Sequence, residues 1–395
     1  MDQPIYLDNN STTPVDPQVI DVMLPYFHEI PGNAASQHKP GQRAEDAIEY
    51  AREKVAHIIN AKAHELIFTS GATESLNIAI AGIYKNSDRG NHIITSSTEH
   101  PAVLQCCKVL EVRGAELTNL RVKNNGEIDL AELKRSVKES TCLIALMYAN
   151  NETGVINPVA SISEIASEHG IPFICDAAQA VGKIPVDVES DGIDIMAFSA
   201  HKMYGPKGVG TLFISRKYEK ELIPNYYGGE PAYRTGRQER GLRPGTLNVP
   251  GIVGFGEACQ IAQDNMNQEG ARILILRNEL EAQLLNSCQC EINGAGTNRL
   301  PNTCNISFGN IEAQLLLESV YDQLALSTGS ACSSGNSKPS HVLKAMGKSS
   351  DQIMGAVRIS LGKYTTSENI HFAAEIIRER IEAFGLTTFE ESKNL

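Results

Sequence analysis

A lysine with polar neighbours lies between two apolar runs near the middle of the chain. The segment Ser199–Gly208, which contains Lys202, follows the apolar residues 194–198 and precedes a second apolar run at 209–214. This pattern predicts a polar turn between two buried strands. A lysine at the end of a buried strand is partly desolvated, which lowers its pKa and lets the neutral amine attack a carbonyl. A solvated loop lysine would have the same local sequence, so Lys202 needs a partner before it indicates chemistry.

An acidic residue supplies that partner at the end of another apolar run. Residues 171–175 lead into Asp176, and Gln179 follows three positions later. A pyridoxal phosphate site needs a lysine that forms a Schiff base and a carboxylate that keeps the pyridine nitrogen protonated, so that the ring can accept electrons. Lys202 and Asp176 therefore predict pyridoxal 5'-phosphate as the cofactor.

Other polar residues also follow apolar strands. Thr73 comes after the run 65–69, His100 after 92–95 and Asn151 after 142–149. Apolar strands that alternate with helices indicate an α/β fold with a mainly parallel sheet covered on both faces. Ligands bind beyond the carboxyl ends of such strands. Taken singly, Thr73 is equally typical of a phosphate-binding helix start and of an ordinary capped helix. A lone histidine such as His100 is more often structural.

The length and net charge of the chain limit the number of domains and the classes of function that we expect. The chain has 395 residues, which predicts two domains. We expect a large domain over residues 16–258 and a smaller α+β domain formed by 1–15 and 259–395. A net charge of −12 and the lack of a long apolar run predict neither a general nucleic-acid surface nor a membrane role. The N-terminal residues show no export signal, so we expect a cytoplasmic protein.

Cysteine and arginine add two further candidates. The nine cysteines are odd in number and lack C-x-x-C pairs, so neither a disulfide framework nor a metal site is expected. Cys332 lies in the polar run 327–337, which predicts an accessible thiol in a mobile loop with a chemical role. Arg358 lies between Val357 and Ile359, where it forms either a structural salt bridge or a bidentate grip on a substrate carboxylate.

These residues lie in motifs that resemble a known family. From Ile5 to about Phe384 the chain resembles the cysteine desulfurases of the NifS/IscS type, which are class V pyridoxal phosphate enzymes with the aspartate-aminotransferase-like fold type I. The motifs that carry the likeness are Thr69–Ser75, Thr98–His100, Asn150–Glu152, Asp176–Gln179, Ser199–Gly208 and Ser327–Cys332.

The resemblance implies a role for each candidate. Lys202 would bind the cofactor covalently, Asp176 would pair with the pyridine nitrogen and Gln179 would contact the ring hydroxyl. His100 would stack on the ring and transfer protons. Asn151 and Arg358 would bind the substrate carboxylate. The residues that would bind the cofactor around its phosphate are Ala72, Thr73, Ser199, His201 and, from the other subunit of a homodimer, Thr246.

The implied reaction removes sulfur from L-cysteine, releases L-alanine and leaves a persulfide on Cys332. An iron–sulfur scaffold or another sulfur-acceptor protein would receive the sulfur. One alternative is another class V reaction, such as that of a selenocysteine lyase, an aminotransferase or an epimerase, none of which needs a thiol in a flexible loop. A second alternative is a non-catalytic scaffold, against which the retention of both Lys202 and Cys332 argues.

Overall fold

A seven-stranded sheet lies at the centre of the larger part of the molecule, in the order β2-β8-β7-β6-β5-β3-β4. The computed structural model describes residues 3–228, 238–309, 311–328 and 339–391, with residues 385–391 described by backbone alone. Six strands run in one direction and β8 is antiparallel to its two neighbours. The predicted α/β fold with a mainly parallel sheet is confirmed. The strands are β2 (Leu66–Thr69), β3 (His92–Ser96), β4 (Glu116–Leu120), β5 (Thr141–Met147), β6 (Phe173–Asp176), β7 (Ile195–Ser199) and β8 (Gly210–Ile214).

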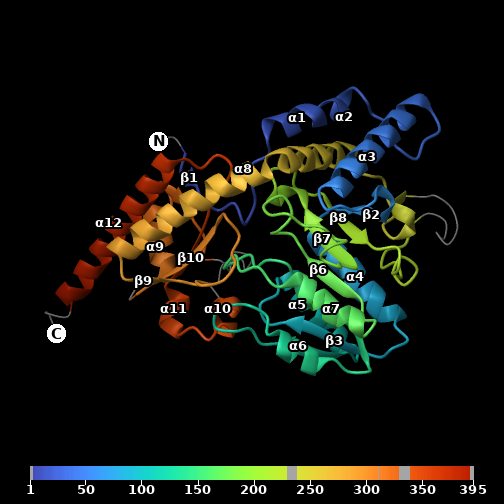
Figure 1. The fold of residues 1–395 in the computed structure, drawn as a ribbon. Coiled ribbons are helices and arrows are strands. Elements are labelled where there is room, and N and C mark those ends of the chain that lie inside the picture. The colour runs from blue at the N-terminus through green and yellow to red at the C-terminus, as the bar shows by residue number, and fades with distance from the viewer. Residues whose placement is uncertain (1–2, 229–237, 310, 329–338, 392–395) are drawn as a thin grey trace.

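Helices cover both faces of this sheet (Figure 1). Neighbouring residues of a strand point to opposite faces. Ile67 packs in one apolar cluster with Ile78 and Val103, whereas Phe68 packs in another with Ile48. Because both faces are buried, the central strands are apolar throughout. The helices concerned are α3 (Lys39–His57), α4 (Ala72–Asn86), α5 (Pro101–Val112), α6 (Leu130–Ser136) and α7 (Val159–Glu168).

The smaller part contains an antiparallel sheet in the order β12-β10-β9 and has a core of its own. Leu7 belongs to this core, and β1 (Ile5–Tyr6) pairs in parallel with β11 (Leu324–Ala325). These contacts support the assignment of residues 1–15 to the small domain, and the boundaries 16–258 and 259–395 stay predictions. The other elements are β9 (Cys290–Ile292), β10 (Thr303–Phe308), β12 (Ala356–Ser360), α9 (Ala313–Val320), α10 (His341–Ala345), α11 (Ser350–Met354) and α12 (Ser367–Glu391).

One long helix, α8 (Val249–Ser287), runs along both parts (Figure 1). Its N-terminal half packs on α3 and on the short helices α1 (Pro17–Met23) and α2 (Pro25–His28), and its C-terminal half packs on α12 and β10. Gly256 allows the close approach of α3, because a Cβ atom there would lie 2.7 Å from the Cα atom of Ala51. The helix therefore fixes the two parts relative to each other.

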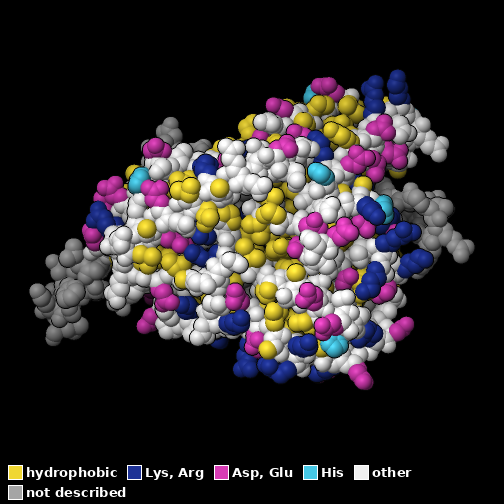
Figure 2. Space-filling model, viewed as in Figure 1, with side chains coloured by type: hydrophobic (Ala, Val, Ile, Leu, Met, Phe, Trp, Pro, Cys, Tyr) yellow, Lys and Arg dark blue, Asp and Glu magenta, His cyan; other side chains and the backbone are white. Residues whose placement is uncertain are grey.

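Charges of both signs are mixed over the surface shown in Figure 2, around a group of apolar side chains near the middle of that face. Within the residues that the structure describes, no helix is both long and apolar enough to cross a bilayer. The same residues contain no cluster of three His, Cys, Asp or Glu side chains suited to hold a metal ion.

A buried ion pair joins α3 to the segment that precedes α8. Arg52 donates to the two carboxylate oxygens of Glu239, from Nη2 at 2.8 Å and from Nη1 at 3.0 Å. The Arg52 guanidinium also lies 4.5 Å from the centre of the Phe68 ring. The Arg52 and Glu239 side chains are only 9% and 0% exposed. Each buried charge therefore depends on the other for compensation.

Replacing Glu239 with glutamine should lower the free energy of unfolding by about 3 kcal/mol, because the Arg52 charge stays buried without its carboxylate. Glu49→Gln is the matched control, since Glu49 also contacts Arg52, at 3.1 Å, but is 57% exposed. Loss of that exposed pair should cost less than about 1 kcal/mol. Denaturant unfolding of the two variants measures the difference, and equal losses would contradict the expectation.

Candidate active site

Polar side chains collect at the edge of the large sheet where the parallel strands reach their carboxyl ends. β6 ends at Asp176 and β7 ends at Ser199, with Lys202 in the turn that follows. His100 follows β3 and Asn151 follows β5. The sheet topology therefore places these five predicted residues on the same side of the molecule, where open α/β sheets bind ligands.

A cavity of about 320 Å³ lies between the first turn of α4 and the turn after β7. The backbone N–H of Ala72 donates to Ser199 Oγ at 2.7 Å, which fixes this hydroxyl in the cavity wall. Within the described residues, the next two N–H groups, of Thr73 and Glu74, have no protein acceptor. Unpaired N–H groups at the start of a 15-residue helix attract an anion.

Two glycines shape the turn between β2 and α4 beside this cavity. Gly71 has a φ of +152°, a conformation that favours glycine. A Cβ atom on Gly210 of β8 would lie 2.6 Å from Gly71 Cα, so the strand and the turn can touch only without a side chain there. Gly71 is also the residue that precedes α4, and it supplies no capping side chain. Of the two interpretations of this helix start, anion binding therefore fits better than an ordinary cap.

His201 forms another wall of the cavity. Its Nδ1 atom lies 3.2 Å from Thr12 Oγ1. Burial and then the charges of Lys202, Lys207 and Lys183 lower the pKa of His201 to about 4. The ring is therefore neutral at pH 7 and can offer an N–H to an anion. Thr12 and Lys207 also line the cavity. The sequence analysis did not single them out, because neither lies in a helix or strand pattern.

His100 and Asp176 carry opposing electrostatic effects. Burial raises the pKa of the Asp176 carboxyl, while the charges of His100 and Lys202 and a hydrogen bond from the Ala178 N–H, at 3.0 Å, oppose the rise. Burial lowers the pKa of His100, and Asp176 opposes that change. His100 Nδ1 accepts from the Ala102 N–H at 3.1 Å, so the proton of the neutral ring is on Nε2.

The N-terminal segment closes the site around Lys202. Lys202 Nζ donates to the carbonyl oxygens of Asn10 and Ser11, each at 2.7 Å. Gln179 Nε2 donates to the same Asn10 carbonyl at 2.9 Å. Asn10 is buried, and its side chain also donates to Thr303 Oγ1 of β10 at 2.9 Å. Asn10 therefore links the lysine turn to the smaller part of the chain, a role that the sequence analysis missed.

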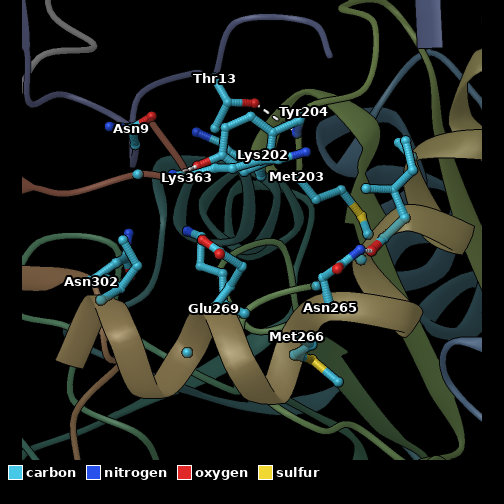
Figure 3. Close-up of a pocket in the computed structure, with 18 of the residues that line it drawn as sticks. Asn9, Thr13, Lys202, Met203, Tyr204, Asn265, Met266, Glu269, Asn302 and Lys363 are labelled. Atoms are coloured by element: carbon cyan, nitrogen blue, oxygen red, sulfur yellow. Dashed lines mark hydrogen bonds between the residues drawn. The ribbon is translucent and has the colours of Figure 1, made fainter. Parts of the chain in front are cut away.

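Lys202 also borders a second cavity, of about 90 Å³, on the side of α8. Figure 3 shows Glu269 of α8 pointing toward Tyr204 and Lys363 across this space, which Met266 also lines. The lysine turn thus lies between the sheet edge and the long helix. Tyr204 has a φ of +64°, a left-handed conformation that a β-branched residue would adopt only under strain.

Arg358 is buried and held by three groups. Its Nη2 atom donates to Asp8 Oδ1 at 2.7 Å and to Ser11 Oγ at 2.6 Å, and Nη1 donates to the carbonyl oxygen of Asn151 at 3.1 Å. The structural salt bridge, one of the two interpretations of this arginine, is therefore present. Arg358 Nε is buried without a partner in the described residues. A guanidinium N–H without a partner is also what a carboxylate-binding arginine would present.

Two predicted residues lie elsewhere. Thr246 is exposed, in the segment just before α8, and does not line the cavity at α4. Arg243 in the same segment contacts Glu74 of α4 at 3.3 Å. This exposure suits a contact with a second subunit, which stays a prediction. Cys332 lies outside the described residues.

The donor set fits pyridoxal phosphate. The α4 cavity offers unpaired N–H groups, the Ser199 hydroxyl and the neutral His201 ring to a phosphate. Asp176 is a buried carboxyl whose desolvation a cationic ring nitrogen would offset. Lys202 lies in the turn between them and can reach an aldehyde. The three groups that the cofactor requires thus occur at one sheet edge.

Comparison with known proteins agrees with this chemistry. The sequence profile of the family "Aminotransferase class-V" matches residues 5–372. The cysteine desulfurase IscS of Anaeromyxobacter dehalogenans is 45% identical over 381 residues, which are 96% of this chain and 92% of that protein.

Solved structures of NifS-like and related proteins also resemble this chain. A NifS-like protein has a TM-score of 0.88 and 37% identity, and the match covers 96% of this chain and 99% of that one. The structure described as SspA in complex with cysteine has a TM-score of 0.79 and 34% identity, and covers 91% of this chain and 99% of its own.

The acid sensitivity of the cofactor-free chain should depend on His201. Its pKa of about 4 in the folded state lies below the value of about 6.5 expected when the chain is unfolded. The unfolded state therefore binds more protons between these values, and stability falls as the pH drops from 6.5 to 4. His201→Gln should lose less stability over this interval than the parent chain. Unfolding titrations at several pH values measure this, and an unchanged pH dependence would contradict it.

Proposed function

This chain belongs to the aminotransferase class-V family, and from that membership we propose that it is a pyridoxal phosphate-dependent cysteine desulfurase. It takes sulfur from L-cysteine, releases L-alanine and holds the sulfur as a persulfide on Cys332. The observation that carries the proposal is the convergence of Lys202, Asp176 and the anion cavity of α4 at one sheet edge. Among the reactions of this family, the 45% identity to the cysteine desulfurase of Anaeromyxobacter dehalogenans favours removal of sulfur from cysteine.

The geometry of the α4 cavity supports three of the phosphate-binding residues, and the fourth comes from the family resemblance. Thr73, Ser199 and His201 hold the phosphate, together with Thr246 of the partner subunit in a homodimer. Asp176 pairs with the pyridine nitrogen. When bound, pyridoxal phosphate withdraws electrons from the α-carbon of the substrate.

Lys202 and His100 move protons at the substrate. Lys202 takes the α-proton once its amine is released, and the carbonyl oxygens of Asn10 and Ser11 then stabilise the ammonium that forms. His100 stays neutral near pH 7, because burial lowers its pKa, and its Nε2–H faces away from the Ala102 cap. The neutral ring can therefore donate a hydrogen bond from Nε2, and it passes on a proton only after it has been protonated, a form that the charge of Asp176 favours.

Arg358 and Asn151 bind the substrate carboxylate. Arg358 Nη1 contacts only a neutral carbonyl, that of Asn151, and Nε has no partner among the described residues. A carboxylate is a stronger acceptor than a carbonyl, so a substrate carboxylate can replace the Asn151 carbonyl at Nη1. Asp8 keeps Nη2 in place while this exchange occurs.

The sulfur step belongs to Cys332. Its thiolate attacks the substrate sulfur, so that an S–S bond forms as the Cβ–S bond breaks and the carbon side takes up a proton to become alanine. The eight cysteines that the structure describes are poor substitutes. Burial raises the thiol pKa of each of them, for example to about 11 for Cys106 and for Cys290. A thiol with a raised pKa is seldom the thiolate that reacts.

The proposal extends to partners and location. The persulfide is passed to an iron–sulfur scaffold or another sulfur-acceptor protein. The enzyme acts as a homodimer, because Thr246 is exposed and completes the site of the neighbouring subunit. A cytoplasmic location suits a chain whose eight described cysteines are all free, since thiols stay reduced there.

Replacing Cys332 with serine should lower the rate of alanine formation from cysteine by about 100-fold or more, because no nucleophile then accepts the sulfur. The absorbance of bound pyridoxal phosphate should be unchanged. Cys288→Ser is the matched control, because Cys288 is only partly buried and lies far from the sheet edge on the helix-to-strand turn before β9. Product analysis of alanine and sulfide measures both variants, and unchanged turnover in Cys332→Ser would refute the proposal.

A further inference from the structure

A second lysine, Lys183, lies close to the residues that accept hydrogen bonds from Lys202. The proposed reaction gives it no role. Lys183 Nζ donates to Asn10 Oδ1 at 3.2 Å and to Gln179 Oε1 at 2.5 Å. Lys202 Nζ donates to the backbone carbonyl of the same Asn10. Two amines therefore share one buried residue as acceptor.

The turn after β6 explains why Lys183 lies there. The Val181 N–H donates to the Ala177 carbonyl at 3.2 Å and the Lys183 N–H to the Ala180 carbonyl at 3.0 Å, so the turn is coiled. Gln179 and Lys183, four positions apart, then project to the same side. Gly182 has a φ of +79°, and a Cβ atom there would lie 2.7 Å from Met203 Cε. A glycine thus lets this turn pack against the residue that follows Lys202.

The surroundings of Lys183 disfavour its charge. Within the described residues it makes no ion pair, and its two acceptors are neutral amides. Burial, then the positive charges of Lys202 and Arg358, holds the pKa of Lys183 well below its ordinary value. Electrostatic coupling between two groups is mutual, so a proton on Lys183 disfavours a proton on Lys202 to the same extent.

We propose that Lys183 is a positioning residue for Lys202: the two amines compete for one proton beside Asn10, so that Lys183 favours the neutral amine of Lys202. This inference rests on the proposed function, in which Lys202 must act as an amine and as a base. The same contacts of Lys183 hold Gln179 and Asn10 in place.

Other charged groups face Lys202 and bear on its protonation. His201 adjoins it, and Asp176 and His100 act on it from the ends of β6 and β3. Arg358 acts from β12 but is paired with Asp8. On the side of α8, the charged groups are paired with each other: Asp16 with Lys363, and Glu269 with Arg272. Lys183 is therefore a nearby cation without a carboxylate partner among the described residues, as is Lys207, whose charge acts on His201.

The test is a spectral pH titration of the holoenzyme, which reports protonation of the nitrogen that joins Lys202 to the cofactor. Lys183→Met should move the transition to higher pH by about one unit, as expected when one nearby charge is removed. Lys183→Arg, which keeps a cation, should restore the parent value. Lys363→Met is the matched control, because Lys363 lines the cavity beside Lys202 but is neutralised by Asp16. A purely structural role of Lys183 predicts weaker cofactor binding with no shift, and that result would overturn the proposal.

A second measurement separates this inference from the proposed function. In the cofactor-free full-length chain, the rate at which Lys202 is acetylated at each pH, read by mass spectrometry, reports its neutral fraction. The coupled pair should make Lys202 reactive at a lower pH in the parent chain than in Lys183→Met. If Lys183→Met does not fold, Lys183→Gln takes its place, and an unchanged pH dependence of Lys202 acetylation in that variant would refute the coupling. Absence of cofactor absorbance would instead refute the proposed function and leave this result standing.

Discussion

The site depends on the requirement that buried polar groups find hydrogen-bond partners. Asn10 is 1% exposed, and every polar atom of its side chain and its carbonyl is used. Its partners come from the turn of Lys202, the turn of Gln179 and Lys183, and the smaller part of the chain. No one of these elements could shift without leaving a buried amide or amine unpaired. The position of the reactive lysine is thus set largely by Asn10, whose carbonyl oxygen accepts from the Lys202 amine.

The same requirement explains why different kinds of polar group lie at the two ends of the site. The phosphate end uses backbone N–H groups, a hydroxyl and a neutral imidazole, none of which carries a charge that must be neutralised when the ligand is absent. The ring end uses one buried carboxyl, Asp176, whose charge is costly until a cation arrives. Neutral donors at one end and a destabilised acid at the other are complementary to a ligand with an anionic tail and a cationic ring.

Much of this arrangement could be predicted from local sequence. The central strands are buried on both faces, so they read as apolar runs, and Asp176, Ser199 and Lys202 stand out where those runs end. The edge strand β4 gave no such signal, because most of its residues are exposed or partly exposed. The start of α8 at Val249 follows the Asn248 cap, whose side chain accepts from the Gly251 N–H.

The role of the N-terminal segment could not be predicted in this way. Asn10 contacts Lys183 and Ser360 across 173 and 350 positions of sequence, and no local pattern encodes such contacts. The Arg52–Glu239 pair spans 187 positions and was missed for the same reason. The spacing of Gln179 and Lys183 after a strand end was a usable signal, since a coiled turn places both on one side.

The contact between Asn10 and Ser360 also has a consequence for synthesis of the protein. Asn10 leaves the ribosome among the first residues, whereas the Ser360 hydroxyl that accepts from its backbone N–H follows 350 positions later. At about 5–20 residues per second, the wait is on the order of 20–70 seconds. After β8 has been made, and until the end of that time, the segment that holds Lys202 has its large-sheet partners but lacks those of β10 and β12. A chain released early can therefore form the sheet and still lack a finished active site.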